Sequence, residues 1–114
     1  MSLEVTIRAV GEIRVAAARG RLVLGAGAEN LHCQLRALID GGCAKILINL
    51  IEVQQIDSTG ISTLVRNYVA LTRAGGALKL ACPFGRVREL LDLTRISGVI
   101  PTFDDEASAL ASFR

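Results

Sequence analysis

The chain has 114 residues, of which 51% are hydrophobic, 21% are charged and 4% are aromatic, with no tryptophan. This length is typical of one domain, and the hydrophobic fraction is high enough for a packed core, which excludes a disordered chain. The net charge of +2 is the balance of 13 basic and 11 acidic residues, and the basic residues are scattered along the chain. Together with the few aromatic residues, this scatter argues against a nucleic-acid-binding protein.

The first predicted element is a β-hairpin. Apolar and polar side chains alternate over residues 3–10, which is the period of a half-buried strand. Gly11 and Glu12 form a tight turn, and residues 13–22 continue as the second strand. The glycine-rich stretch of residues 25–27 is predicted to be a loose connection to the next element.

An amphipathic helix is predicted over residues 29–40, and Gly41 and Gly42 end it. Its apolar residues recur at helical spacing, namely Leu31, Leu35, Leu38 and Ile39. Residues 44–51 are an almost continuous aliphatic run, typical of a central strand that is buried on both faces. Residues 52–57 are predicted to connect this strand to the next helix.

A second amphipathic helix is predicted to begin after Asp57 and to end at Gly75 and Gly76. The expected apolar face comprises Ile61, Leu64, Val65, Tyr68 and Leu71. The expected polar face comprises Ser62, Arg66, Asn67 and Arg73.

The rest of the chain contains four more predicted elements: a strand over residues 77–82, a helix over residues 87–94, a short strand near Val99 and Ile100, and a last helix capped by Asp104 or Asp105. The resulting order, β-β-α-β-α-β-α-β-α, predicts one α/β domain over residues 1–114. We expect a mixed, mostly parallel sheet of four to five strands, with about four helices packed mainly on one side.

Enzyme and metal motifs are missing from the sequence. There is no G-x-S-x-G motif and no phosphate-binding loop, and His32 is the only histidine. The three cysteines, Cys33, Cys43 and Cys82, form no C-x-x-C pair and are expected to be buried and reduced. We therefore predict no catalytic residue, no metal site and no cofactor.

The sequence also carries no targeting signal that we can identify. Residues 1–4 include an acid and begin no apolar signal-peptide core. The longest aliphatic stretch, residues 46–51, is too short to cross a bilayer and contains Asn49. These features predict a cytoplasmic protein without membrane insertion.

One segment could carry a regulatory function. Asp57, Ser58 and Thr59 lie between the buried strand and the second helix, at the kind of strand end where α/β proteins bind ligands and partners. The structural interpretation is that Asp57 or Ser58 caps the helix and that Gly60 eases the turn. The functional interpretation is that a hydroxyl at this helix start is a modification site, where a phosphate adds nearly two negative charges. The two interpretations are compatible.

Five segments resemble the STAS domain of bacterial anti-sigma-factor antagonists. They are residues 45–50, 56–61, 75–80, 87–94 and 103–110, and together they extend over nearly the whole chain. The resemblance implies a partner-switching cycle, in which an anti-sigma factor that is also a serine kinase of the ATPase type phosphorylates Ser58. The unmodified protein binds this kinase, the sigma factor is released, and a PP2C-type phosphatase resets the cycle.

The same resemblance implies roles for the residues around Ser58. Thr59 is the alternative phosphate acceptor, and Asp57, Ser58, Thr59, Gly60 and Ser62 are expected to bind the partner. One departure is that Val23 follows Gly20–Arg21–Leu22 where many members have an aspartate, which leaves the contact made by that acid in doubt. Two alternatives remain open: a STAS subunit that regulates a transporter ATPase or a larger assembly without phosphorylation, and a nucleotide-binding or enzymatic role.

Overall fold

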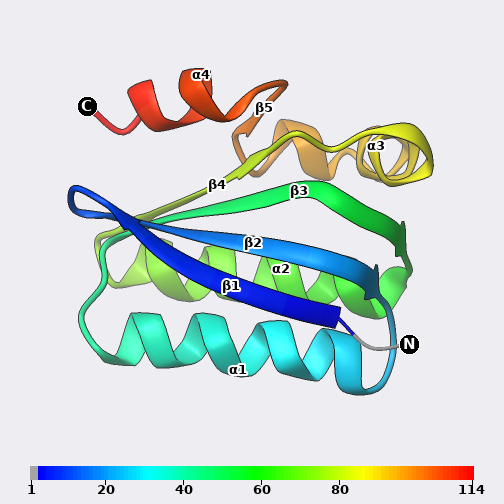
Figure 1. The fold of residues 1–114 in the computed structure, drawn as a ribbon, viewed down its shortest axis with the longest axis horizontal. Coiled ribbons are helices and arrows are strands. Elements are labelled where there is room, and N and C mark those ends of the chain that lie inside the picture. Colours follow the sequence, from blue (N-terminus) through cyan, green and yellow to red (C-terminus); the bar gives the residue numbers. More distant parts are fainter. Residues whose placement is uncertain (1–2) are drawn as a thin grey trace.

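The computed structural model describes residues 3–114 and is built around a five-stranded sheet (Figure 1). The strands are β1 (Leu3–Val10), β2 (Ile13–Leu22), β3 (Lys45–Ile56), β4 (Ala77–Ala81) and β5 (Thr102–Phe103). They lie side by side in chain order; β1 is antiparallel to β2, and the other neighbours are parallel. The predicted mixed, mostly parallel sheet is thus confirmed. The prediction about a signal peptide partly concerns Met1 and Ser2, which lie outside the described residues.

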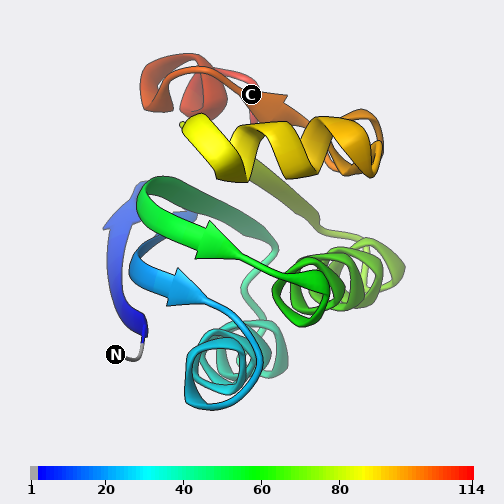
Figure 2. The same cartoon turned by 90° about the vertical axis from the view of Figure 1, so that its right-hand side faces the viewer.

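Four α-helices flank the sheet, namely α1 (Ala26–Asp40), α2 (Ser58–Arg73), α3 (Gly85–Leu93) and α4 (Glu106–Ala111), with a short 3-10 helix, η1, at Ile96–Gly98. Helices α1 and α2 run side by side along one side of the sheet, and α4 lies across the other side (Figures 1 and 2). Buried residues of α1, α2 and α3 join one large hydrophobic cluster, whereas α4 contributes to a small second cluster. Helix packing mainly on one side is therefore confirmed.

Strand β3 forms the centre of the core because it is buried on both faces. Ile46, Ile48 and Leu50 belong to the large cluster, whereas Leu47 belongs to the small one. This arrangement explains the aliphatic run in the sequence, since a strand covered on both faces needs apolar residues at successive positions.

Strand β3 extends to Ile56, so the predicted connection over residues 52–57 is wrong. Its pairing with β2 has two register shifts, each of which inserts an extra β3 residue. The buried residues after the first shift, Leu50, Val53 and Ile56, are therefore spaced by three rather than two. The Asn49 side chain accepts a hydrogen bond from the backbone N–H of Ile51 at 2.9 Å, which satisfies a donor at this irregularity.

The predicted strand at Val99 and Ile100 is also wrong. These residues follow η1, and strand β5 begins only after Pro101. Proline lacks an N–H but offers a carbonyl, and the Pro101 carbonyl accepts the Leu80 N–H of β4 at 2.9 Å. Ile100 is fully buried, so its hydrophobicity serves the core and not a strand.

Helix α1 begins at Ala26, three residues before its predicted start. Ala26 and Gly27 of the glycine-rich segment are thus part of the helix, and Gly25 is its N-cap, so the segment is not a loose connection. A Cβ on Gly27 would clash with the backbone carbonyl of Arg21, so this glycine allows α1 to approach the end of β2. All three cysteines are unpaired, but Cys33 is exposed on α1, which corrects the expectation that they are buried.

Polar contacts at the amino-terminal end of α4 cap the helix and hold it on the sheet. Asp105 caps the helix by accepting the Ser108 N–H at 2.7 Å, which decides between the two predicted caps. Glu106 pairs with Arg8 of β1 and accepts a 2.8 Å hydrogen bond from Asn49 of β3. The Arg8 guanidinium, and then the Asn49 amide, lower the pKa of Glu106, while burial opposes this shift.

Candidate functional site

The candidate site lies where β2 and β3 end and α1 and α2 begin. Leu22 and Ile56, the last residues of these two strands, are paired in register, so the loops that follow them meet at one edge of the sheet. Strand β4 pairs with β3 only as far as Asn49, so the ends of β2 and β3 project beyond β4. This projection carries Ser58 away from the centre of the sheet.

Asp57 joins the two loops through its carboxylate. One oxygen accepts the Gly60 N–H at 2.9 Å and so caps α2, and the other accepts the Leu24 N–H at 2.9 Å. The Leu24 N–H is the largest cause of a lowered pKa for Asp57; burial opposes this shift, and the Gly60 N–H adds to it. The carboxylate is therefore ionised at neutral pH and anchors the β2–α1 loop to the start of α2.

Ser58 is the first residue of α2, and its side chain is exposed. Because Asp57 caps the helix, the Ser58 hydroxyl is not needed for that purpose. Within residues 3–114 this hydroxyl makes no hydrogen bond. It is thus available to another molecule without loss of the helix cap.

The other predicted site residues divide into an exposed and an internal group. Ser62 is exposed and lies one turn after Ser58 on the same helix face. Thr59 is half-buried, and its carbonyl accepts the Thr63 hydroxyl at 3.0 Å. Gly60 is buried, as discussed next, and Asp57 is half-buried between the two loops.

Gly60 allows close packing between α2 and the end of β2. A Cβ at this position would clash with the Leu22 carbonyl oxygen and would lie 2.8 Å from the Ile56 side chain. Its φ is not in the left-handed region, so the turn itself does not require glycine. The structure thus explains Gly60 by internal packing, and its contact with a partner remains a prediction.

Leu24 is an exposed apolar residue at the site that the sequence pattern does not indicate. It lies in the β2–α1 loop, 76% exposed, with its backbone N–H held by Asp57. An isolated exposed leucine is common on protein surfaces. Its position beside the start of α2 could not be read from the sequence, because the two loops are more than thirty residues apart along the chain.

Asn67 was expected on the polar face of α2 but is fully buried. Its amide Nδ2 donates to the Thr63 carbonyl at 2.9 Å and contacts His32 Nδ1 at 3.0 Å, which links α2 to α1. The amide oxygen has no partner among the described residues. His32 is half-buried, and its contact with Asn67 joins the two helices.

A groove runs between α1 and α2 beside this contact and has a volume of about 380 Å³. We call it the α1–α2 groove; its lining includes Leu24, Glu29, His32, Thr59, Thr63 and Arg66. Thr59 places it next to Ser58. The groove therefore belongs to the same end of the molecule as the candidate modification site.

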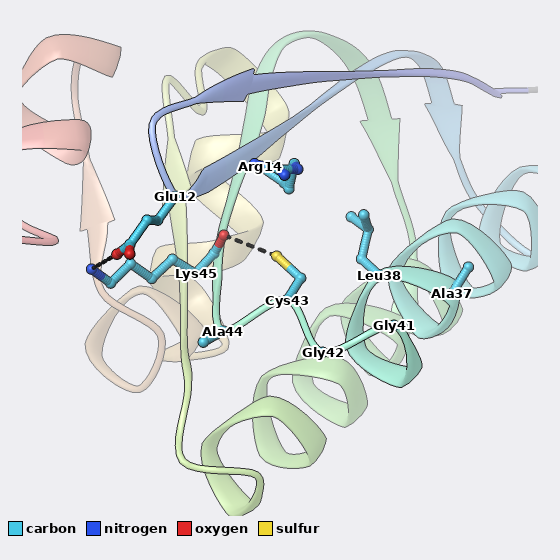
Figure 3. Close-up of a pocket in the computed structure, with 9 residues that line it drawn as sticks. All are labelled: Glu12, Arg14, Ala37, Leu38, Gly41, Gly42, Cys43, Ala44 and Lys45. Atoms are coloured by element: carbon cyan, nitrogen blue, oxygen red, sulfur yellow. Dashed lines mark hydrogen bonds and ion pairs between the residues drawn. The ribbon is translucent and has the colours of Figure 1, made fainter.

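A second hollow lies at the opposite end of the strands, between the β1–β2 turn and the α1–β3 connection (Figure 3). Its charged groups contact other parts of the protein. Lys45 pairs with Glu12 at 3.3 Å, and Arg14 donates to the Gly11 carbonyl at 3.3 Å. The Cys43 thiol donates to the Lys45 carbonyl at 3.4 Å. This hollow is thus separate from the candidate site and has few free polar groups.

No three His, Cys, Asp or Glu side chains in residues 3–114 gather closely enough to hold a metal ion. In the same residues, no helix is both long and apolar enough to cross a membrane.

Comparisons with known proteins give the family of this fold. A sequence model of the STAS domain matches residues 5–109. The anti-sigma F factor antagonist of Paenibacillus polymyxa is 28% identical over 68 residues, which are 60% of this chain and 58% of that protein. The matched part thus spans less than two thirds of that relative.

Two solved structures share the fold. An anti-sigma factor antagonist from Mycobacterium paratuberculosis has a TM-score of 0.90 and 19% identity, covering 99% of this chain and 95% of that chain. The phosphorylated form of the Bacillus cell fate determinant SpoIIAA has a TM-score of 0.75 and 19% identity, covering 97% of this chain and 100% of that chain. At these identities the likeness shows the fold alone.

Proposed function

The chain belongs to the STAS domain family, and from this premise we propose that it is an anti-sigma-factor antagonist switched by phosphorylation of Ser58. In this proposal the unmodified protein binds an anti-sigma factor that is also a serine kinase of the ATPase type. The kinase then releases its sigma factor. A relative named as an anti-sigma F factor antagonist supports the general role.

The proposal rests on one observation: Asp57, and not Ser58, caps α2. Asp57 caps α2, which leaves the exposed Ser58 hydroxyl without a structural task. In the proposed step, the Ser58 oxygen bonds to the γ-phosphorus of ATP, the bond to ADP breaks, and a base of the kinase takes the hydroxyl proton. The cap remains in place throughout.

Phosphorylation of Ser58 should leave the domain folded but should weaken its binding to the partner. A phosphate carries about −1.5 to −2 charges at neutral pH, and the amino-terminal end of a helix stabilises negative charge. The same charge pressed against a partner loses its water without gaining a counter-ion, which is costly. Phosphorylation thereby weakens binding without unfolding the domain, and a PP2C-type phosphatase restores the hydroxyl by hydrolysis.

Exposure favours Ser58 over its neighbours as the acceptor. Thr59 is half-buried, so a kinase would reach its hydroxyl less easily. Ser62 is exposed but lies within the helix, where a phosphate would be farther from the free N–H groups of the helix start. We therefore assign the modification to Ser58 and keep Thr59 as the alternative.

Phosphosite mapping tests this assignment. The protein would be isolated from growing and starved cells of its source organism, as wild type and as the Ser58→Ala and Ser62→Ala variants, and analysed by mass spectrometry. We expect phosphate on Ser58 in wild type and in Ser62→Ala, and none in Ser58→Ala. An unmodified Ser58 under all conditions, together with a stably bound transporter ATPase, would instead favour a regulatory subunit without a phospho-switch.

A further inference from the structure

The α1–α2 groove presents a hydrogen-bond donor whose identity the surrounding contacts determine. The Thr63 carbonyl accepts from Asn67 Nδ2, which fixes the orientation of the amide. The same nitrogen faces His32 Nδ1, so the neutral ring accepts there and carries its proton on Nε2. Because His32 also lines the groove, Nε2–H is the ring group left to donate to a bound molecule.

Positive charge surrounds this donor. Burial, then Arg66 and then Arg36 lower the pKa of His32, so the ring is neutral at neutral pH within a positive field. Neither Arg36 nor Arg66 forms a salt bridge within residues 3–114, and both are exposed. Glu29 is the one acidic side chain that lines the groove. Arg66 of α2, which lines the groove, and Arg36 of α1, which lies outside the lining, thus both place positive charge near His32.

The groove also has an apolar rim. Leu24 lines it with 76% of its surface exposed, and its backbone is held by the Asp57 carboxylate. An exposed apolar side chain on an anchored backbone, close to a cation without a salt bridge, suits a protein-binding contact, because the loop that carries it need not be reorganised on binding.

We propose that the α1–α2 groove binds an acidic segment of the partner, with a carboxylate placed between Arg66 and His32 and an apolar side chain placed against Leu24. This inference rests on the proposed function for the existence of a partner and adds the chemistry by which that partner is recognised. Charge complementarity selects the occupant: the groove offers the Arg66 cation and the neutral His32 donor, the Arg36 charge acts on His32 from outside the lining, and Glu29 disfavours a second carboxylate near the Leu24 end.

The location explains how the switch and the recognition site are coupled. Thr59 lines the groove and is adjacent to Ser58, so a phosphate on Ser58 would add negative charge beside the place where the partner's carboxylate binds. Like charges repel, which adds to the desolvation penalty described above. The same groove thereby favours an acidic partner before phosphorylation and rejects it afterwards.

The first test needs no partner protein. The ¹⁵N-labelled full chain would be titrated with a short peptide of leucine and glutamate, and with the same peptide carrying glutamine instead of glutamate. We expect shift changes at Leu24, His32, Thr59 and Arg66 with the acidic peptide only. Changes scattered over the surface, or equal changes with the neutral peptide, would overturn the inference.

The second test uses the purified kinase that the wild-type protein captures, and measures its affinity for wild type and for each variant. Arg66→Gln should weaken its affinity about fivefold at low salt, and the loss should shrink at high salt. Glu29→Gln should instead strengthen binding, because it removes the one acid of the groove. Arg73→Gln, at the exposed end of α2, is the matched control and should have no effect.

The outcomes separate the two proposals. If Ser58→Asp weakens binding but Arg66→Gln behaves like Arg73→Gln, the groove assignment is wrong and the phospho-switch stands. If Arg66→Gln and Glu29→Gln change the affinity in the same direction, charge complementarity is refuted. If Ser58→Asp binds like wild type, the phospho-switch is wrong, and the peptide titration still decides whether the groove prefers acidic segments.

Discussion

Replacing Asp57 with asparagine should destabilise the protein by about 2 kcal/mol at neutral pH. The carboxylate accepts two backbone hydrogen bonds of 2.9 Å, one from Leu24 and one from Gly60. A hydrogen bond to a charged group contributes about 1.5–3 kcal/mol. The isosteric amide retains one acceptor but turns an NH₂ group toward the other donor. One charged hydrogen bond is therefore lost and the other is weakened.

The size of this effect should depend on pH. The Leu24 N–H, and to a lesser degree the Gly60 N–H, lower the folded-state pKa of Asp57 against the opposing effect of burial. A lowered pKa means that the stabilisation is fully present above the unfolded-state pKa of about 3.9 and is lost as the pH falls through the folded-state pKa. Asparagine does not titrate, so the gap between wild type and variant should be constant near neutrality and should narrow below a pH of about 3.9.

Urea denaturation at neutral pH and at acidic pH measures this gap. Asp105→Asn is the matched control, because Asp105 caps α4 through one backbone N–H, that of Ser108, and otherwise accepts only the hydroxyl of the same residue. Asparagine caps helices about as well as aspartate, so this substitution should change the free energy of unfolding little. The reasoning is refuted if Asp57→Asn costs no more than Asp105→Asn at neutral pH, or if its cost remains unchanged at a pH well below about 3.9.

Three other substitutions test the surroundings of the site by the same assay. Gly60→Ala should cost about 1–3 kcal/mol, because the new methyl group overpacks the contact between α2 and β2; Gly98→Ala, around which nothing lies within 4 Å, should be tolerated, and equal costs would contradict this explanation. Asn67→Ala should cost about 2 kcal/mol, since it removes the donor to the Thr63 carbonyl and to the half-buried His32 ring, and a neutral result would mean that the contact between α1 and α2 is not formed in solution. Ile61→Asp should cost about 2 kcal/mol or more, because Ile61 packs against the large cluster; an unchanged unfolding midpoint would place this side chain in solvent.

The elements that follow a regular period could be predicted from the sequence. Three patterns show this: the alternation in the hairpin, the aliphatic run of β3 and the apolar stripe of α1. In each, buried residues recur at a regular spacing along the chain, so the pattern of apolar residues predicts the element. The start of α2 could also be predicted, because Asp57 is a good cap residue at a change of period. The sequence does not decide whether Asp57 or Ser58 caps this helix. In the structure the cap is Asp57, whose carboxylate is also held in place by the Leu24 N–H.

The errors arise where burial depends on a contact between distant segments. The helical period predicts Asn67 on the polar face, but its hydrogen bonds to His32 and to the Thr63 carbonyl allow it to be buried. The aliphatic run predicts a strand that ends at Ile51, but β3 continues to Ile56, where its register shifts change the spacing of buried residues from two to three. The pairing with β2 causes this change, and it joins segments that are far apart in the chain, so no short stretch of the sequence shows it.

The most direct test of the phospho-switch is a comparison of the partners captured by wild type, Ser58→Ala and Ser58→Asp from a lysate of the source organism, with Thr72→Asp as a charge control at the exposed far end of the same helix. The account predicts that wild type, Ser58→Ala and Thr72→Asp retain a kinase-type ATPase and that Ser58→Asp does not. Equal retention of one partner by all four proteins would contradict the switch and would leave Ser58 as an exposed residue at a helix start.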